Sequence, residues 1–101
     1  MSNELNTIKE KIIKNKAYLR ETYGVEEIGV FGSYARGDQD DGSDIDIAIE
    51  INHDKVAVGF FEFSRMQRFL EELLGKKVDL VTKRAIKPYI KDRILAQMIM
   101  I

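Results

Sequence analysis

The segment from residue 43 to residue 49, Ser-Asp-Ile-Asp-Ile-Ala-Ile, constrains the fold more than any other part of this 101-residue chain. Its alternation of aspartate and isoleucine predicts a β-strand with one apolar face and one polar face. Because side chains two residues apart on a strand point the same way, Asp44 and Asp46 are expected on one surface. Neighbouring carboxylates repel each other, and a divalent cation between them would relieve that repulsion.

A glycine–serine pair precedes this strand. Val25 to Phe31 is expected to form another strand, and Ser33 to Arg36 a short helix. Gly32, between them, would let the backbone approach a phosphate closely. The N–H groups and hydroxyl of a strand-to-helix junction make a suitable anion site. Phosphate donors thus lie close in sequence to a cation-binding face, a combination that suggests a nucleoside triphosphate with magnesium.

These residues closely resemble the signature of the nucleotidyltransferase superfamily related to DNA polymerase β, which is Gly-Ser, ten residues and Asp-x-Asp. Gly32-Ser33, residues 34–43 and Asp44-Ile45-Asp46 match it without a gap. The longer form, Gly-Ser-Tyr-Ala-Arg-Gly followed by Ser-Asp-Ile-Asp, resembles the minimal nucleotidyltransferase (MNT) subgroup, whose members are about this short. The resemblance implies a small α/β (α+β) fold like the polymerase β palm, with a mixed sheet and helices packed on one face.

The remaining sequence predicts the helices and strands of such a fold, and its length suggests a single domain over residues 1–101. The expected elements are helices over residues 3–23 and about 58–74, strands over 25–31, 44–51 and 77–81, and a final helix that starts near Pro88 and runs towards the C-terminus. Gly24 and Gly75 are expected to end the first two of these helices. The phenylalanines at 60, 61, 63 and 69 are expected in the core. The apolar residues 98–101 either pack on the core or meet a partner.

Composition narrows the class of protein. Hydrophobic residues make up 45% of the chain, enough for one modest core, but no apolar run approaches the length of a membrane span. The polar N-terminus and the absence of cysteine favour a cytoplasmic protein without a membrane partner. A net charge of −1 argues against general nucleic-acid binding. Seven basic residues between Lys76 and Arg93 form either a solvated face or a surface for a triphosphate or an acidic partner.

A third carboxylate, Asp79, lies between Val78 and Leu80 in the predicted third strand. By spacing alone it is either a surface-facing strand residue or a further metal ligand. Superfamily members carry a third acidic residue on a strand after the Asp-x-Asp, and Asp79 matches that position. The resemblance therefore implies two-metal nucleotidyl transfer, in which Asp44 and Asp46 hold two Mg²⁺ ions and Asp79 binds the ion that activates the attacking hydroxyl.

The resemblance also implies a substrate and a partner. Gly32 and Ser33 would hold the β- and γ-phosphates of ATP, and Arg36 would neutralise charge on the triphosphate or the leaving pyrophosphate. The MNT subgroup usually occurs as the antitoxin beside a HEPN-family ribonuclease toxin, and can transfer AMP from ATP to a tyrosine of that toxin. Two alternatives stay open: a non-catalytic antitoxin that neutralises its toxin by binding, and a transferase that acts on a small-molecule acceptor.

Overall fold

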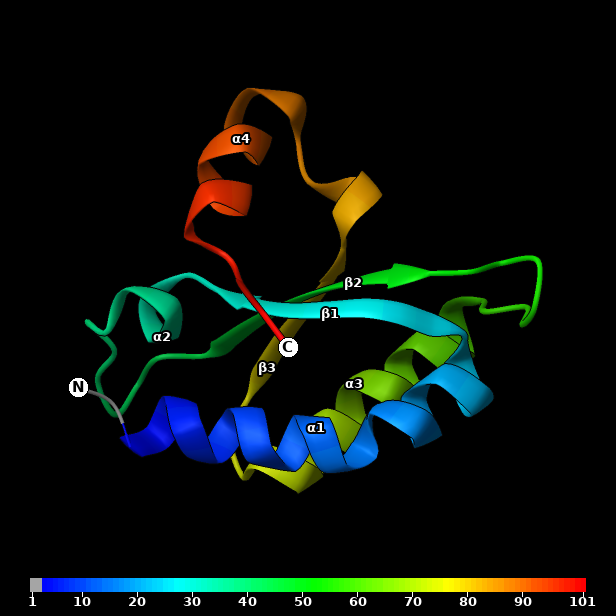
Figure 1. The fold of residues 1–101 in the computed structure, drawn as a ribbon, viewed down its shortest axis with the longest axis horizontal. Helices are drawn as coiled ribbons and strands as arrows, with labels where there is room; N and C mark the ends of the chain where they lie inside the picture. The colour runs from blue at the N-terminus through cyan, green and yellow to red at the C-terminus, as the bar shows by residue number, and fades with distance from the viewer. Residues whose placement is uncertain (1–2) are drawn as a thin grey trace.

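A four-stranded sheet with two long helices against one face forms the centre of the protein (Figure 1). The computed structural model describes residues 3–101. Its elements in chain order are α1 (Asn3–Tyr23), β1 (Val25–Phe31), α2 (Ser33–Arg36), β2 (Ile45–Ile51), α3 (Phe60–Leu74), β3 (Val78–Thr82), the 3-10 helix η1 (Lys83–Ala85), α4 (Pro88–Gln97) and β4 (Ile99–Met100). None of the helices within this range is long and apolar enough to cross a membrane.

The sheet is mixed, as the sequence predicts. Its strands lie in the order β3-β2-β1-β4, with β1 antiparallel to β2 and to β4 and with β2 parallel to β3. Neighbouring parallel strands need a crossover connection, which α3 supplies between β2 and β3. This crossover brings the start of β3 beside the start of β2, and both strands begin at the end of the sheet where β1 stops.

Alternation along β2 decides which face of the sheet becomes the core. Ile45, Ile47 and Ile49 are fully buried, whereas Asp46 between them is only half-buried. α1 and α3 cover the apolar face (Figure 1). The large side chains they bury there include Ile12, Leu19, Met66 and Leu70. Each contributes roughly 1.5–3 kcal/mol to folding, so packing on this face holds the polar residues of the strand on the opposite face.

The end of the chain packs on that opposite face. A Cβ atom placed on Gly29 of β1 would lie 2.7 Å from Cγ of Met98 and 2.9 Å from Sδ of Met100. The two methionines therefore rest directly on the backbone of the central strand. α4 stands away from the sheet (Figure 1), and none of its ten residues is buried.

Several sequence-based boundaries need correction. β2 begins at Ile45 rather than at Asp44, α3 begins at Phe60 rather than near residue 58, and β3 is displaced by one residue. Phe63 and Phe69 pack against the core as predicted. The prediction is wrong for Phe60 and Phe61, which are 78% and 74% exposed. They occupy the first turn of α3, where the helix extends past the edge of the core.

The last helix starts at Pro88, as expected, and is followed by a short strand that the sequence did not predict. The helix stops at Gln97, and the two-residue strand β4 follows it and pairs with β1. Ile101 donates its N–H to the carbonyl oxygen of Ile28 at 3.0 Å, while its own carbonyl accepts a hydrogen bond from Lys16 Nζ at the same distance. Of the two roles considered for this tail, the structure supports packing on the rest of the protein.

Candidate active site

Two of the three predicted aspartates face each other across neighbouring strands. Asp46 of β2 is in register with Asp79 of β3 in the parallel pair. Strands in a sheet lie about 4.8 Å apart, so two side chains in register on one face are direct neighbours. The flanking residues Ile45 and Val78 are buried in the core, and both carboxylates consequently lie on the face opposite α1 and α3.

Asp44 lies at the edge of this face. It is exposed and directly precedes β2. The next residue, Ile45, donates its N–H to the carbonyl oxygen of Lys77 at 2.9 Å, which anchors the beginning of β2 beside the start of β3. Asp44 thereby joins the other two aspartates at one end of the sheet.

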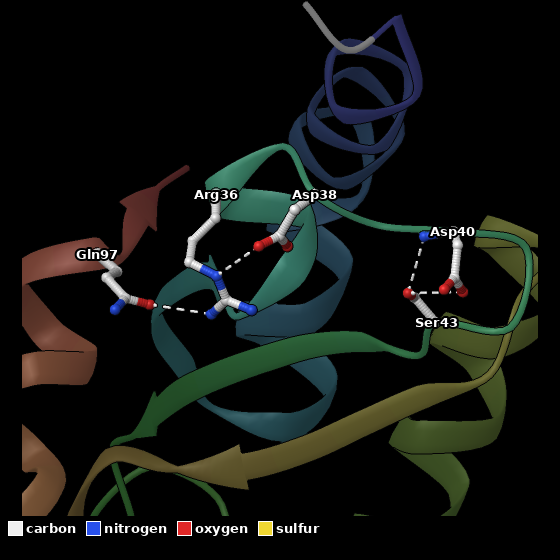
Figure 2. Close-up of polar contacts among 5 residues, drawn as sticks. All are labelled: Arg36, Asp38, Asp40, Ser43 and Gln97. Atoms are coloured by element: carbon white, nitrogen blue, oxygen red, sulfur yellow. Dashed lines mark hydrogen bonds and ion pairs between the residues drawn. The ribbon is translucent and has the colours of Figure 1, made fainter.

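The loop before Asp44 is closed by its own side chains. Asp40 accepts hydrogen bonds from the N–H of Gly42 at 2.9 Å and from the hydroxyl of Ser43 at 3.3 Å. The Asp40 N–H donates to the same hydroxyl at 3.0 Å (Figure 2). Such local bonds are typical of aspartate in turns. Asp40 therefore has a structural role and fixes the path of the chain into Asp44.

Nearby charged side chains have opposite effects on the pKa of Asp46. The pKa of Asp46 is raised from 3.8 to about 6, first by burial and then by the negative charges of Asp79 and Asp44, while the positive charge of Arg36 lowers it. An acid in such surroundings favours either a proton or a cation. A raised carboxyl pKa caused by burial and specific charged neighbours is typical of functional sites.

The glycine–serine turn touches the same carboxylate. Gly32 has φ +74° and ψ −149°, a combination that is essentially restricted to glycine. A Cβ atom there would lie 2.0 Å from Oδ2 of Asp46. Ser33 follows as the half-buried first residue of α2. Only a residue without a side chain allows the turn to approach Asp46 this closely, so the predicted phosphate turn and the predicted metal ligands form one continuous surface.

Arg36 lies close to the cluster but is held by other residues. Figure 2 shows its guanidinium between α2 and the end of α4. Its Nε lies 3.1 Å from Oδ2 of Asp38, and its Nη1 donates to Oε1 of Gln97 at 3.3 Å. Neither partner was predicted from the sequence. Asp38, two residues from Arg36, is a local signal that could have been used, whereas nothing in the sequence pointed to Gln97, which is 61 residues away.

The cluster suits a hard divalent cation by its chemistry. It offers carboxylate oxygens, the ligand type that Mg²⁺ binds. Burial, followed by the negative charges of Asp79 and Asp44, raises the pKa of Asp46, and a bound cation would offset those negative charges. Within residues 3–101, however, no group of three or more Asp, Glu, His or Cys side chains lies so that it could hold a metal ion by itself.

Comparison with known proteins identifies the family. Residues 11–101 match the family model described as the nucleotidyltransferase domain. The chain belongs to the nucleotidyltransferase family. This confirms the family predicted from the glycine–serine and Asp-x-Asp motifs, and the mixed α/β architecture is the one expected for it.

Relatives and solved structures resemble this nucleotidyltransferase over most of its length. A Thermococcus cleftensis protein named protein adenylyltransferase MntA is 39% identical over 95 residues, covering 94% of this chain and 93% of that protein. A structure provisionally described as a minimal nucleotidyltransferase has a TM-score of 0.78 at 27% identity, covering 94% of this chain and 93% of the other. A structure described as a toxin–antitoxin with AMP-PNP has a TM-score of 0.68 at 25% identity, covering 98% and 72%.

Proposed function

We propose that this nucleotidyltransferase transfers AMP from ATP to a hydroxyl group of a toxin protein and thereby acts as an antitoxin. The observation that carries the proposal is the contact between Gly32 and Asp46, with Asp79 in register beside it. This contact joins a turn suited to phosphate to an acidic pair suited to a cation. The names of the similar proteins, a protein adenylyltransferase and a toxin–antitoxin with AMP-PNP, support the same activity.

In this proposal the chain's own residues bind and orient the reactants. Asp44, Asp46 and Asp79 would hold two Mg²⁺ ions, which would neutralise phosphate charge and acidify the attacking hydroxyl. Gly32 and Ser33 hold the β- and γ-phosphates, and Arg36 neutralises charge on the triphosphate and on pyrophosphate.

The reaction is an in-line displacement at phosphorus. The acceptor oxygen forms a bond to the α-phosphorus of ATP while the bond from that phosphorus to the bridging oxygen of the β-phosphate breaks. Asp79 accepts the hydroxyl proton, and pyrophosphate leaves with the electron pair of the broken bond. The partner we propose is a HEPN-family ribonuclease toxin encoded by the adjacent gene, modified on a tyrosine in the cytoplasm, where ATP is available.

Intact-mass spectrometry of that toxin tests the proposal. The toxin is incubated with this chain, ATP and Mg²⁺, and we expect its mass to rise by whole units of AMP. Asp46→Asn and Asp79→Asn should abolish the gain, because each removes a cation ligand. Glu50→Gln is the matched control, since Glu50 lies on the same strand and the same face as Asp46 but at the far end of β2, and it should leave the transfer intact.

The alternatives give different results in the same experiment. A stable complex between the two proteins with no mass gain would refute AMP transfer and favour an antitoxin that acts by binding. AMP appearing on an added small hydroxyl compound, with the toxin unmodified, would instead indicate a small-molecule acceptor. Equal transfer by the wild-type chain and the Asp46→Asn variant would refute the assignment of the acidic cluster.

A further inference from the structure

The guanidinium of Arg36 is oriented from two sides by residues of different charge. Asp38 contacts Nε at 3.1 Å and Gln97 accepts from Nη1 at 3.3 Å (Figure 2). The side chain of Arg36 is 47% exposed. An exposed arginine with only one partner would sample many rotamers, and ordering it on binding a ligand would cost free energy. Two contacts at different nitrogen atoms define the plane of the guanidinium before any ligand arrives.

Gln97 is held in place by the packing of the residues after it. It is the last residue of α4, and Met98 next to it packs on the backbone of Gly29. Ile99 and Met100 then pair with Val30 and Gly29 of β1. The same strand continues directly into Gly32. β1 therefore positions both the glycine–serine turn and Gln97. Because the backbone of Gln97 is held in this way, its amide oxygen can orient the guanidinium of Arg36.

The neutrality of the glutamine matters for the charge of Arg36. Asp38 already forms an ion pair with Arg36, and a second carboxylate would offset most of the positive charge offered to a phosphate. An amide oxygen accepts the hydrogen bond without adding negative charge. The positive charge of Arg36 still reaches the acidic cluster, where it partly offsets the rise in the pKa of Asp46 that burial and the neighbouring carboxylates cause. The pair of contacts thus combines a fixed orientation with charge that remains available.

We propose that Gln97 is a positioning residue that pre-orients Arg36 for the phosphates of the nucleotide. The inference depends on the phosphate role of Arg36 in the proposed function. The nucleotide site then includes the end of α4, which is 61 residues from Arg36 in the sequence. Gln97 acts on the nucleotide through Arg36 rather than directly.

Calorimetric binding of AMP-PNP in the presence of Mg²⁺ tests this inference in a double-mutant cycle. Gln97→Met keeps the length of the side chain and removes the acceptor. In the wild-type background we expect binding to weaken roughly three- to tenfold, which lies within the range for the net contribution of one typical intramolecular hydrogen bond. In the Arg36→Ala background, which itself binds more weakly, the same change should have no further effect, because the group that Gln97 orients is absent.

Tyr89→Ala is the matched control. Tyr89 lies in the first turn of α4 and is 80% exposed, so its removal changes the helix surface without touching Arg36, and binding should stay at the wild-type level. Thermal melts of every variant identify any loss of the fold. Unchanged binding by Gln97→Met, equal losses in both backgrounds, or no effect of Arg36→Ala would each overturn the inference.

This test measures nucleotide affinity, whereas the test of the proposed function measures AMP transfer. The calorimetry needs neither the toxin nor a transfer reaction. A chain that binds AMP-PNP with the expected coupling but leaves the toxin unmodified would retain the role of Gln97 and lose the toxin as acceptor. A chain that modifies the toxin normally in the Gln97→Met variant, with unchanged nucleotide affinity, would retain the function and lose the role of Gln97.

Discussion

Asp46 is harder to ionise in the folded chain than in the unfolded chain. Its pKa rises from 3.8 to about 6, chiefly through burial and then through the charges of Asp79 and Asp44. Between about pH 4 and pH 6 the folded state therefore binds more protons at this residue than the unfolded state does. By linkage, the contribution of Asp46 to stability is greatest below pH 4 and is lost as the pH rises through 6.

Replacing Asp46 by asparagine should remove this loss of folding stability at higher pH. In EDTA at pH 7.5 we expect Asp46→Asn to be as stable as the wild type or more stable, by about 1 kcal/mol once solvent screening of the half-buried group is allowed for. At pH 4 the two proteins should be equally stable. Urea unfolding at both pH values measures the difference. A sharp loss of stability in the variant at pH 7.5 would mean that Asp46 is structural.

Residue patterns in the sequence predicted the face of the sheet on which Asp46 lies, but they did not predict the contacts of Arg36. Alternation with buried isoleucines placed Asp46 on the open face, because burial of one set of side chains determines where the other set points. The pairing of Arg36 with Gln97 depends instead on where an exposed helix ends in space, and no local periodicity encodes that position.

The turn between β1 and α2 is the element that joins the two halves of the site. Its path depends on Gly32, where a side chain would collide with Asp46. Gly75 offers a matched comparison. It too has a positive φ, +71°, but among the described residues no atom lies within 4 Å of the place that a Cβ would occupy there. Substituting the two glycines in turn therefore distinguishes the loss of stability caused by a positive φ from the loss caused by a steric clash.

We expect Gly32→Ala to lower stability by about 2–3 kcal/mol and Gly75→Ala by about 1 kcal/mol, the lower figure being that of a positive φ alone. Gly32→Ala should also lose AMP-PNP binding, because the added methyl group displaces either the turn or the Asp46 carboxylate. Gly75→Ala should bind normally. Urea melts and calorimetry provide the two measurements, and equal effects of both substitutions would contradict the proposed close approach.

Elements with strong periodicity were predicted almost to the residue, and weakly encoded elements were not. The bounds of α1 and β1 agree with the expectation from sequence, because α1 has apolar residues at helical spacing and Gly24 separates the helix from the strand. β4 has only two residues, too few to show any alternation, and it forms because β1 offers an unpaired edge. The exposure of Phe60 and Phe61 was missed because helical spacing does not show where the core beneath the helix ends.

The whole molecule should be stabilised by its nucleotide through mass action. At a ligand concentration about 100 times the dissociation constant, binding to the folded state adds about 2.7 kcal/mol, and for a domain of this size that corresponds to a rise in Tm of roughly 10 °C or more. We expect ATP with Mg²⁺ to produce such a shift in a thermal melt and EDTA to reverse it. The Asp46→Asn variant should show no shift, and an undiminished shift in EDTA would refute a magnesium requirement.

The parallel pairing of β2 with β3 has a consequence during protein synthesis. Asp46 leaves the ribosome well before Asp79, because the whole of α3 lies between them, and chains emerge at about 5–20 residues per second. A nascent chain that stops between Ile51 and Val78 carries the glycine–serine turn and the first two aspartates but lacks the strand that completes the acidic pair. If the acidic cluster acts as proposed, a product truncated before Val78 would lack Asp79 and would not transfer AMP, and activity would begin only after β3 has been synthesised.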